Sequence, residues 1–178
     1  MTSRRASVAL TLSIGFASGA WAYECQTYQL PARFLPPPFN SIGGPVDDAL
    51  RSHSQIHDCA LEDVCSATHE SGVELAYLDD SGETRVIQAR YVIGPGKAPA
   101  LPFDVKFDDT LWTVAERVLS SGPSFPPLGV YKRQPDEYVV TTDNCLRFPG
   151  NANGAVTFYF DGDGRLTSVD VSLPWEGD

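Results

Sequence analysis

Hydrophobic and polar residues alternate in two stretches of the chain, and each stretch turns back on itself. Apolar side chains occupy every second position over 73–77, and after an Asp-Asp-Ser-Gly turn a returning strand is expected over 86–93. The same arrangement recurs over 156–160 and 166–173, around the turn Asp-Gly-Asp-Gly. A period of two with a tight turn between the arms predicts two β-hairpins. A further strand is expected over 138–142.

Helical spacing precedes each hairpin. The first helix is expected to begin at Pro45, because proline suits the first helical position, and Asp47 and Asp48 suit the positively polarised first turn. The second helix is expected to follow a cap at Asp109 or Thr110. Its apolar stripe comprises Leu111, Val114, Ala115, Val118 and Leu119.

These elements predict an α+β fold of two related units, each a helix packed on a small antiparallel sheet. The first unit covers 45–93 and the second covers 101–178, with a Gly- and Pro-rich linker at 94–100 and an N-terminal arm at 23–44. Two interpretations of the repeated pattern stay open. One is an internal duplication. The other is two ordinary hairpins, since Asp and Gly are the residues that tight turns require.

The first 22 residues predict a signal peptide that is removed on export. Arg4 and Arg5 precede an apolar run over 6–16 that is too short to cross a bilayer. Small residues then lead to Ala20-Trp21-Ala22, a cleavage site of the A-x-A type. Nothing later in the sequence approaches the length of a membrane span, so a periplasmic or secreted protein without membrane insertion is expected.

Four cysteines lie beyond this segment, at Cys25, Cys59, Cys65 and Cys145. An oxidising compartment favours two disulfides, which would staple the two units. Three pairings are possible. We favour Cys59 with Cys65, which closes a short loop, and Cys25 with Cys145, which ties the arm to the second half of the chain.

The chain is strongly acidic, with 13 basic and 23 acidic residues and a net charge of −10. Loss of Arg4 and Arg5 with the signal peptide would leave 11 basic residues and a net charge of −12. Such a balance argues against a nucleic-acid partner and against anionic membrane surfaces. It is compatible with a basic protein partner, a cation, or solubility alone.

No sequence motif for catalysis is present, so no catalytic residue and no cofactor are assigned. His53 and His57 are four residues apart and could share a helix face as metal ligands. Oxidised cysteines nearby favour an ordinary polar helix end instead. Asp161 and Asp163 resemble the start of a calcium loop, but Arg165 and Leu166 occupy the next ligand and glycine positions, which favours a hairpin turn. No metal is therefore expected.

Exposed aromatic residues provide the best candidates for contact with another protein. Phe125 lies in a proline-rich loop at 124–129, Tyr131 follows that loop, and Trp175 lies in an acidic C-terminal tail. Aromatic anchors on an acidic surface suit a protein-binding face. The alternative is a loop that covers the core and a tail without a role.

A segment of the second unit resembles small exported folds of the bacterial envelope. It runs Leu101-Pro102-Phe103-x-x-Lys106-Phe107-x-Asp109-Thr110-x-x-x-Val114 and is followed by a hairpin with Phe160-Asp-x-Asp-Gly-Arg-Leu166. This pattern is similar to the helix-plus-sheet unit that the β-lactamase inhibitor proteins carry twice and small outer-membrane-assembly lipoproteins carry once. Exported bacterial immunity proteins have similar small folds. The resemblance covers roughly 101–173 and, more faintly, 35–93.

In the β-lactamase inhibitor fold, a hairpin turn with an acidic residue enters the active site of the target. The resemblance therefore implies partner-binding roles for Asp79 and Asp80 in the first turn, and for Asp161 and Asp163 in the second. The bland alternative is that these acids favour tight turns and face water.

Export, disulfides, acidity and the missing catalytic motifs together predict a binding protein rather than an enzyme. The expected function is inhibition or neutralisation of an envelope-acting enzyme or toxin, such as a basic cell-wall hydrolase, because opposite charge speeds association. One alternative is a structural or assembly factor of the envelope. Another is a small hydrolase with an unrecognised site, which a deep pocket with a raised-pKa carboxylate would favour.

Overall fold

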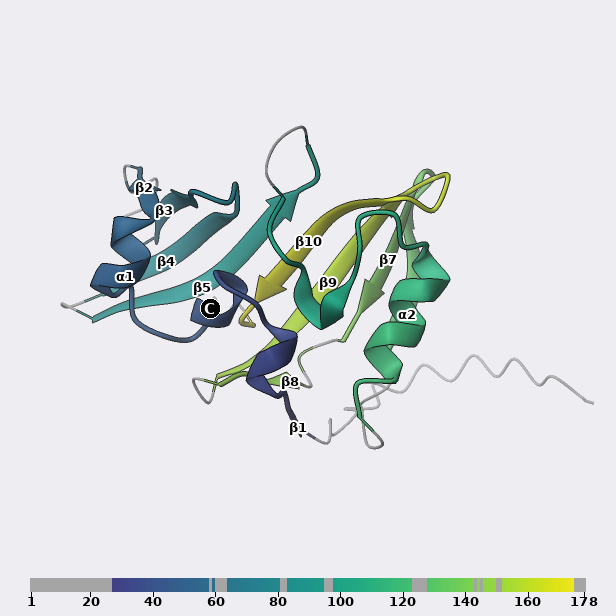
Figure 1. Ribbon diagram of the computed structural model, residues 1–178, viewed down its shortest axis with the longest axis horizontal. Helices are drawn as coiled ribbons and strands as arrows, with labels where there is room; N and C mark the ends of the chain where they lie inside the picture. Colours follow the sequence, from purple (N-terminus) through teal and green to yellow (C-terminus); the bar gives the residue numbers. More distant parts are fainter. Residues whose placement is uncertain are drawn as a thin grey trace, which may run out of the picture.

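The computed structural model describes residues 27–57, 59, 64–80, 83–94, 98–122, 128–142, 144, 146–149 and 152–174 (Figure 1). Its helices are α1 (Asp48–Ser52), α2 (Leu111–Leu119) and the 3-10 turns η1 (Ala32–Phe34), η2 (Phe39–Ser41) and η3 (Pro102–Asp104). Its strands are β1 (Tyr28–Gln29), β2 (Ser54–Ile56), β3 (Val64–His69), β4 (Glu74–Asp80), β5 (Glu83–Val92), β6 (Gly129–Gln134), β7 (Glu137–Thr141), β8 (Leu146–Arg147), β9 (Asn153–Asp161) and β10 (Leu166–Ser172).

All of these strands belong to one sheet. Its main order is β1-β8-β9-β10-β5-β4-β3-β2, and β7 joins through a second pairing with β9 and carries β6 beside it. Only β1 and β8 pair in parallel; every other pair is antiparallel. The two predicted hairpins are present as β4–β5 and β9–β10.

The second strands of the two hairpins pair with each other. Five residues of β5, from Gln88 to Val92, lie opposite five residues of β10, from Ser168 to Ser172. The hairpins therefore share a single sheet, and the expected α+β fold of two units, each with its own small sheet, is wrong. The physical reason lies in the backbone groups of β5 and β10. In two separate hairpins each of these strands would have a long unpaired edge, whereas their pairing satisfies the hydrogen bonds of both edges.

The favoured pairing of Cys59 with Cys65 is confirmed, whereas the predicted number of two disulfides is corrected to one within the described residues. One disulfide, between Cys59 and Cys65, is present in the part of the chain that the structure describes. Cys25 and Cys145, like the expected signal peptide at 1–22, lie outside the described residues. No described helix combines the length and the apolar character that a membrane crossing requires.

The second predicted helix is confirmed as α2. Thr110 is its N-cap, and the backbone N–H of Thr113 donates to the Thr110 hydroxyl. Asp109 has a different task, because its carboxylate accepts hydrogen bonds from Arg117 Nε at 2.8 Å and from the backbone N–H of Lys106 at 2.7 Å. The buried stripe of α2 consists of Leu111, Val114, Ala115 and Val118, while Leu119 is half exposed.

The first helix begins later than predicted and is five residues long. Asp47 is the N-cap of α1, accepting a 2.8 Å hydrogen bond from the backbone N–H of Leu50. Pro45 instead forms an isolated β-bridge with Arg85, and the backbone N–H of Val46 donates to the Thr84 carbonyl. Because this segment is extended along β5, the helix begins only at Asp48. The Cys-bearing segment that follows contributes β2 and β3, which the pattern did not predict.

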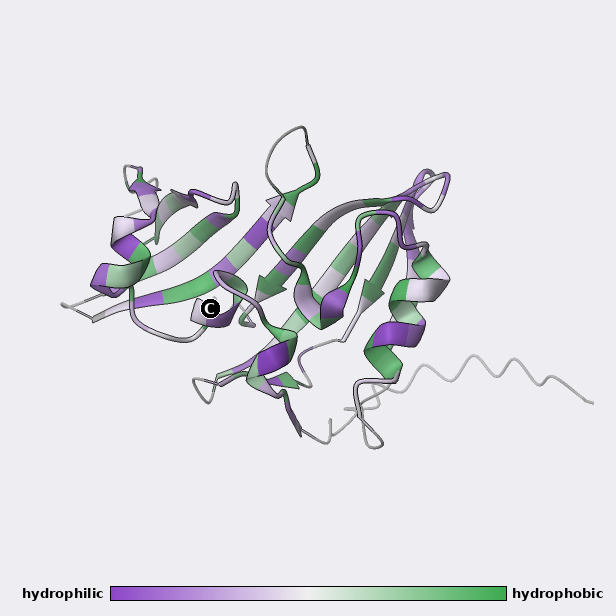
Figure 2. Cartoon of the chain, viewed as in Figure 1, coloured by the Kyte–Doolittle hydropathy of each residue, from purple (hydrophilic) through white to green (hydrophobic). Residues whose placement is uncertain are grey.

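The core lies between the sheet and the helical segments, which Figure 1 shows on one side of the sheet. Figure 2 shows hydrophobic and hydrophilic residues in turn along β9 and β10. Phe158 of β9 is fully buried and its ring centroid lies 6.4 Å from that of Phe103 in η3. Leu35 and Phe39, within the segment expected to be a separate arm, are fully buried in the same core.

This packing predicts opposite outcomes for two aromatic substitutions. Phe158→Ala should lower the free energy of unfolding by about 3–5 kcal/mol, because a fully buried ring leaves a cavity in the core. Trp112→Ala is the matched control: Trp112 lies on α2 with 74% of its surface exposed, and its loss should change stability by less than about 0.5 kcal/mol. Urea unfolding measures both. Equal losses would contradict the assignment of the core to this side of the sheet.

Candidate partner-binding surface

The face of the sheet opposite the core carries a transverse row of side chains that no described helix covers. We call this face of the sheet the outer face. The cross-strand register places five residues of adjacent strands in the row: Tyr131, Val139, Tyr159, Ser168 and Val92. Alternation places these residues opposite Phe158 and Val171, which point into the core. Val139 is fully buried yet has no place in that core, as expected for a residue covered from the other side.

Five residues form a polar cluster on this face, hereafter the outer-face cluster: Gln88, Arg90, Arg133, Tyr159 and Asp170. The guanidinium carbon of Arg133 lies 5.6 Å from the centroid of the Tyr159 ring. The Gln88 amide donates to Asp170 Oδ2 at 2.5 Å. Arg90 is the direct cross-strand neighbour of Asp170. The cluster therefore joins strands β5, β6, β9 and β10.

Burial controls the electrostatics of this cluster. It raises the pKa of Asp170, whose residue is only 6% exposed, while hydrogen bonds from Gln88 and Ser172 and the charge of Arg90 oppose that rise. Burial also raises the pKa of Tyr159, and the Asp170 carboxylate adds to the effect. Arg133 and Arg90 act in the opposite direction on Tyr159. Tyr131, the fourth neighbouring group that acts on Tyr159, raises its pKa as Asp170 does.

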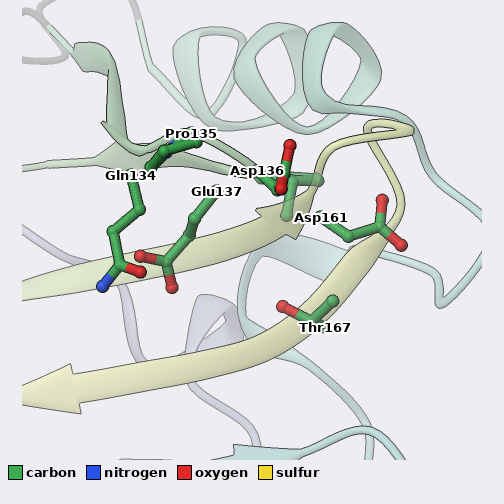
Figure 3. A pocket seen from close by; sticks show the side chains of 7 residues that line it. Gln134, Pro135, Asp136, Glu137, Asp161 and Thr167 are labelled. Carbon is green, nitrogen blue, oxygen red and sulfur yellow. The ribbon is translucent and has the colours of Figure 1, made fainter.

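A small cavity of about 310 Å³ lies at the end of this face, where the β6–β7 turn meets the β9–β10 hairpin. Figure 3 shows Asp136 and Glu137 on that turn, with Asp161 and Thr167 on the hairpin beside them. Glu137 forms a 3.7 Å ion pair with Arg133. Asp161 Oδ1 accepts from the backbone N–H groups of Asp163 and Arg165, so this carboxylate stabilises its own turn.

The structure separates the two acidic turns that the sequence suggested as binding sites. Because β5 and β10 are antiparallel, the β4–β5 turn and the β9–β10 turn lie at opposite ends of the sheet (Figure 1). Asp79 is exposed at one end and Asp163 at the other. The side chain of Asp80 lies outside those that the structure describes. One partner surface of ordinary size therefore has no simple way to use both turns.

Tyr131 is half exposed, as a binding residue requires. It belongs to the strand β6, whereas the sequence placed it only next to a loop. Phe125 and Trp175, the other aromatic candidates, lie outside the described residues. Arg133, Tyr159 and Asp170 were missed from the sequence. The alternation of Val169, Asp170 and Val171 is a signal that could have placed Asp170 on the face away from the core, but it contains nothing about Gln88 of β5.

The histidines do not share a helix face. The helix α1 ends at Ser52, so His53 and His57 follow it. His53 Nδ1 lies 3.2 Å from the Glu70 carboxylate, and His57 Nε2 bonds to the Thr68 hydroxyl at 2.9 Å. Within the described ranges, no group of three or more metal-ligating side chains is arranged to hold an ion.

No family model, curated protein or solved structure matches the chain. The resemblance to β-lactamase inhibitor proteins and related envelope folds therefore stays a prediction from the sequence pattern.

The raised pKa of Asp170 predicts a pH-dependent cost. The folded protein holds the Asp170 proton more tightly than the unfolded chain does, so this residue lowers stability as pH rises above the ordinary aspartate pKa of about 3.9. Asp170→Asn removes that titration and keeps an oxygen that can accept from Gln88. The variant should therefore gain stability relative to the original protein as pH rises from about 4 towards neutrality.

Urea unfolding at a series of pH values measures this difference. Asp163→Asn is the matched control, because Asp163 is exposed and its substitution should produce a smaller and flatter difference. A stability difference for Asp170→Asn that stays constant with pH would contradict the electrostatic description of the cluster.

Proposed function

We propose that this chain is an exported binding protein that inhibits or neutralises an envelope-acting enzyme or toxin, and that β6 with the adjoining outer-face cluster is its contact surface. The observation that carries the proposal is Tyr131. This side chain is 50% exposed at the start of a row that continues into Tyr159, with Arg133 stacked on the second ring.

The composition of this surface supports a protein partner. Tyrosine and arginine are the residues most often found at the energetic centres of protein interfaces. Tyr131, Val130 and Arg133 are exposed together on one strand. Tyrosine also loses little conformational entropy when it is immobilised, because it has only two side-chain torsions. A strand held in a sheet is ordered before binding, which lowers the cost of association further.

Charge has different roles at long and short range. The net charge of −10 favours encounter with a basic protein, in line with a basic cell-wall hydrolase or toxin. At the contact surface itself, Lys132 and Arg133 are exposed cations. We therefore expect a partner that is basic overall and presents acidic or aromatic groups to β6. Export to the periplasm follows from the expected signal peptide, and the Cys59–Cys65 disulfide is compatible with it.

The hydrolase alternative has one observation in its favour, the raised pKa of Asp170. However, Asp170 is not among the residues that line the cavity at the β6–β7 turn. Asp170 is also only 6% exposed, so a substrate has little access to its carboxylate. The arrangement therefore favours binding over catalysis. An assembly factor of the envelope would use the same surface and would differ only in the partner it binds.

Site-specific photocrosslinking tests the proposal. We expect p-benzoylphenylalanine at position 131 to form one abundant crosslink to a single protein when the full chain is exported in a bacterium that contains the partner. The same probe at position 79 is the matched control, because Asp79 is exposed near the end of β4, at the far end of the sheet. Mass spectrometry identifies the product.

The identity of the crosslinked protein separates the alternatives. A toxin or envelope hydrolase whose activity falls when the purified chain is added supports inhibition. Crosslinks from position 79 and none from position 131 would move the contact surface to the β4–β5 turn and contradict the proposal. Robust turnover of an envelope substrate by the purified chain alone would contradict the binding function itself.

A further inference from the structure

The strand β6 has a free edge. It pairs with β7 through Gly129 to Gln134, and among the described strands none lies on its other side. Every side chain from Val130 to Gln134 is exposed, so side chains on both faces of the strand are accessible. The other edge strands are shorter: β2 has three residues and β1 has two. A six-residue edge is long enough to accept another strand.

Free edges in soluble proteins are usually protected by charge or by a bulge. Here Lys132 is the charge, and the register shift between Lys132 and Gln134 is the bulge. Both devices occupy the second half of β6 and leave Gly129 to Tyr131 in regular pairing. Two copies of this chain that paired through β6 would bring four cations together, and their negative net charges would repel. The edge is therefore protected against self-association but open to a strand of complementary charge.

The two cations of β6 lie on opposite faces of the strand. Lys132 Nζ is 5.5 Å from the ring centroid of Tyr138, whereas the Arg133 guanidinium stacks on Tyr159 on the outer face. Arg133 is 54% exposed at its side chain, and its ion pair with Glu137 is long at 3.7 Å. Each aromatic ring holds its cation beside the edge, and both cations keep hydrogen-bond donors for a new partner.

We propose that β6 accepts an extended, acidic segment of the partner protein as an additional strand of the sheet. Main-chain groups of that segment pair with the free edge of β6. Its carboxylates lie opposite Lys132 on one face and Arg133 on the other, and an apolar or aromatic side chain packs against Tyr131. This inference rests on the proposed function and specifies the part of the partner that is bound.

A peptide-display selection tests the inference with a defined probe. A library of random linear peptides is selected on the immobilised chain, and a known strand-binding domain serves as the positive control for the library. We expect the selected peptides to carry acidic residues at alternate or adjacent positions. The double substitution Lys132→Glu with Arg133→Glu should weaken their binding by about tenfold or more, since two attractive cross-strand pairs become repulsive.

Three comparisons make the result specific. Peptides with lysine in place of their acidic residues should bind the double variant better than the original protein. Lys106→Glu is the charge-matched control at an exposed position on another element, and it should leave binding within about twofold. Alternate backbone amides of the bound peptide point towards β6, and the others point away from it. N-methylation of the first set should abolish binding, and N-methylation of the second set should not. Thermal unfolding confirms that each variant is folded.

The failures are distinguishable. Selected peptides that bind regardless of N-methylation would overturn strand addition, although a crosslink from position 131 would still support the proposed function. Peptides without acidic residues, or affinity unchanged by charge reversal at β6, would overturn the acidic chemistry. A selection that yields no peptide while the control domain finds its ligands would overturn the inference as a whole. A crosslink from position 131 to a second copy of the chain would replace the partner segment with self-association.

Discussion

The pairing of β5 with β10 is the contact on which the rest of the structure depends. A single two-stranded hairpin is at best marginally stable in water, because it has too little surface to bury. Pairing the second strands of two hairpins converts both into the centre of one sheet and buries Ala89 and Tyr91 of β5 in the same core as Val169 and Val171 of β10. The helical segments then cover one face, while Tyr131 and Arg133 stay exposed on the other face.

The same pairing builds the candidate surface. It brings Gln88 and Arg90 beside Asp170, so a carboxylate near the middle of a sheet receives a hydrogen bond from a strand more than 80 residues away in sequence. A buried carboxylate costs stability unless it is hydrogen-bonded, and Gln88 reduces that cost. It also sends the two acidic turns to opposite ends of the molecule. The contact surface that we propose lies at the β6 end of the sheet, which it shares with the β9–β10 turn and not with the β4–β5 turn.

Local features were predictable from the sequence, and contacts between distant segments were not. The period-two alternation identified both hairpins, and the apolar stripe with the Thr110 cap identified α2. The predicted start of α1 was wrong because Pro45 forms a β-bridge with Arg85 of β5, a contact that no local rule contains. β6 was missed because all five side chains after Gly129 are exposed, so the strand has no alternation to detect. Tyr131 was therefore named as a candidate without the strand that carries it. Its neighbours Arg133 and Tyr159 became visible only through strand pairing and ring contact.

Native-state hydrogen exchange measures the free energy at which each backbone amide opens. It therefore tests whether β5 and β10 join the two hairpins into one cooperative sheet. If they do, the amides in the middle of β4, β5, β9 and β10 should exchange only through global unfolding, with one common free energy and one common dependence on denaturant. The contradicting result is exchange of the β4–β5 amides through a separate opening of lower free energy, while the amides of β9 and β10 stay protected. The two hairpins would then be independent units.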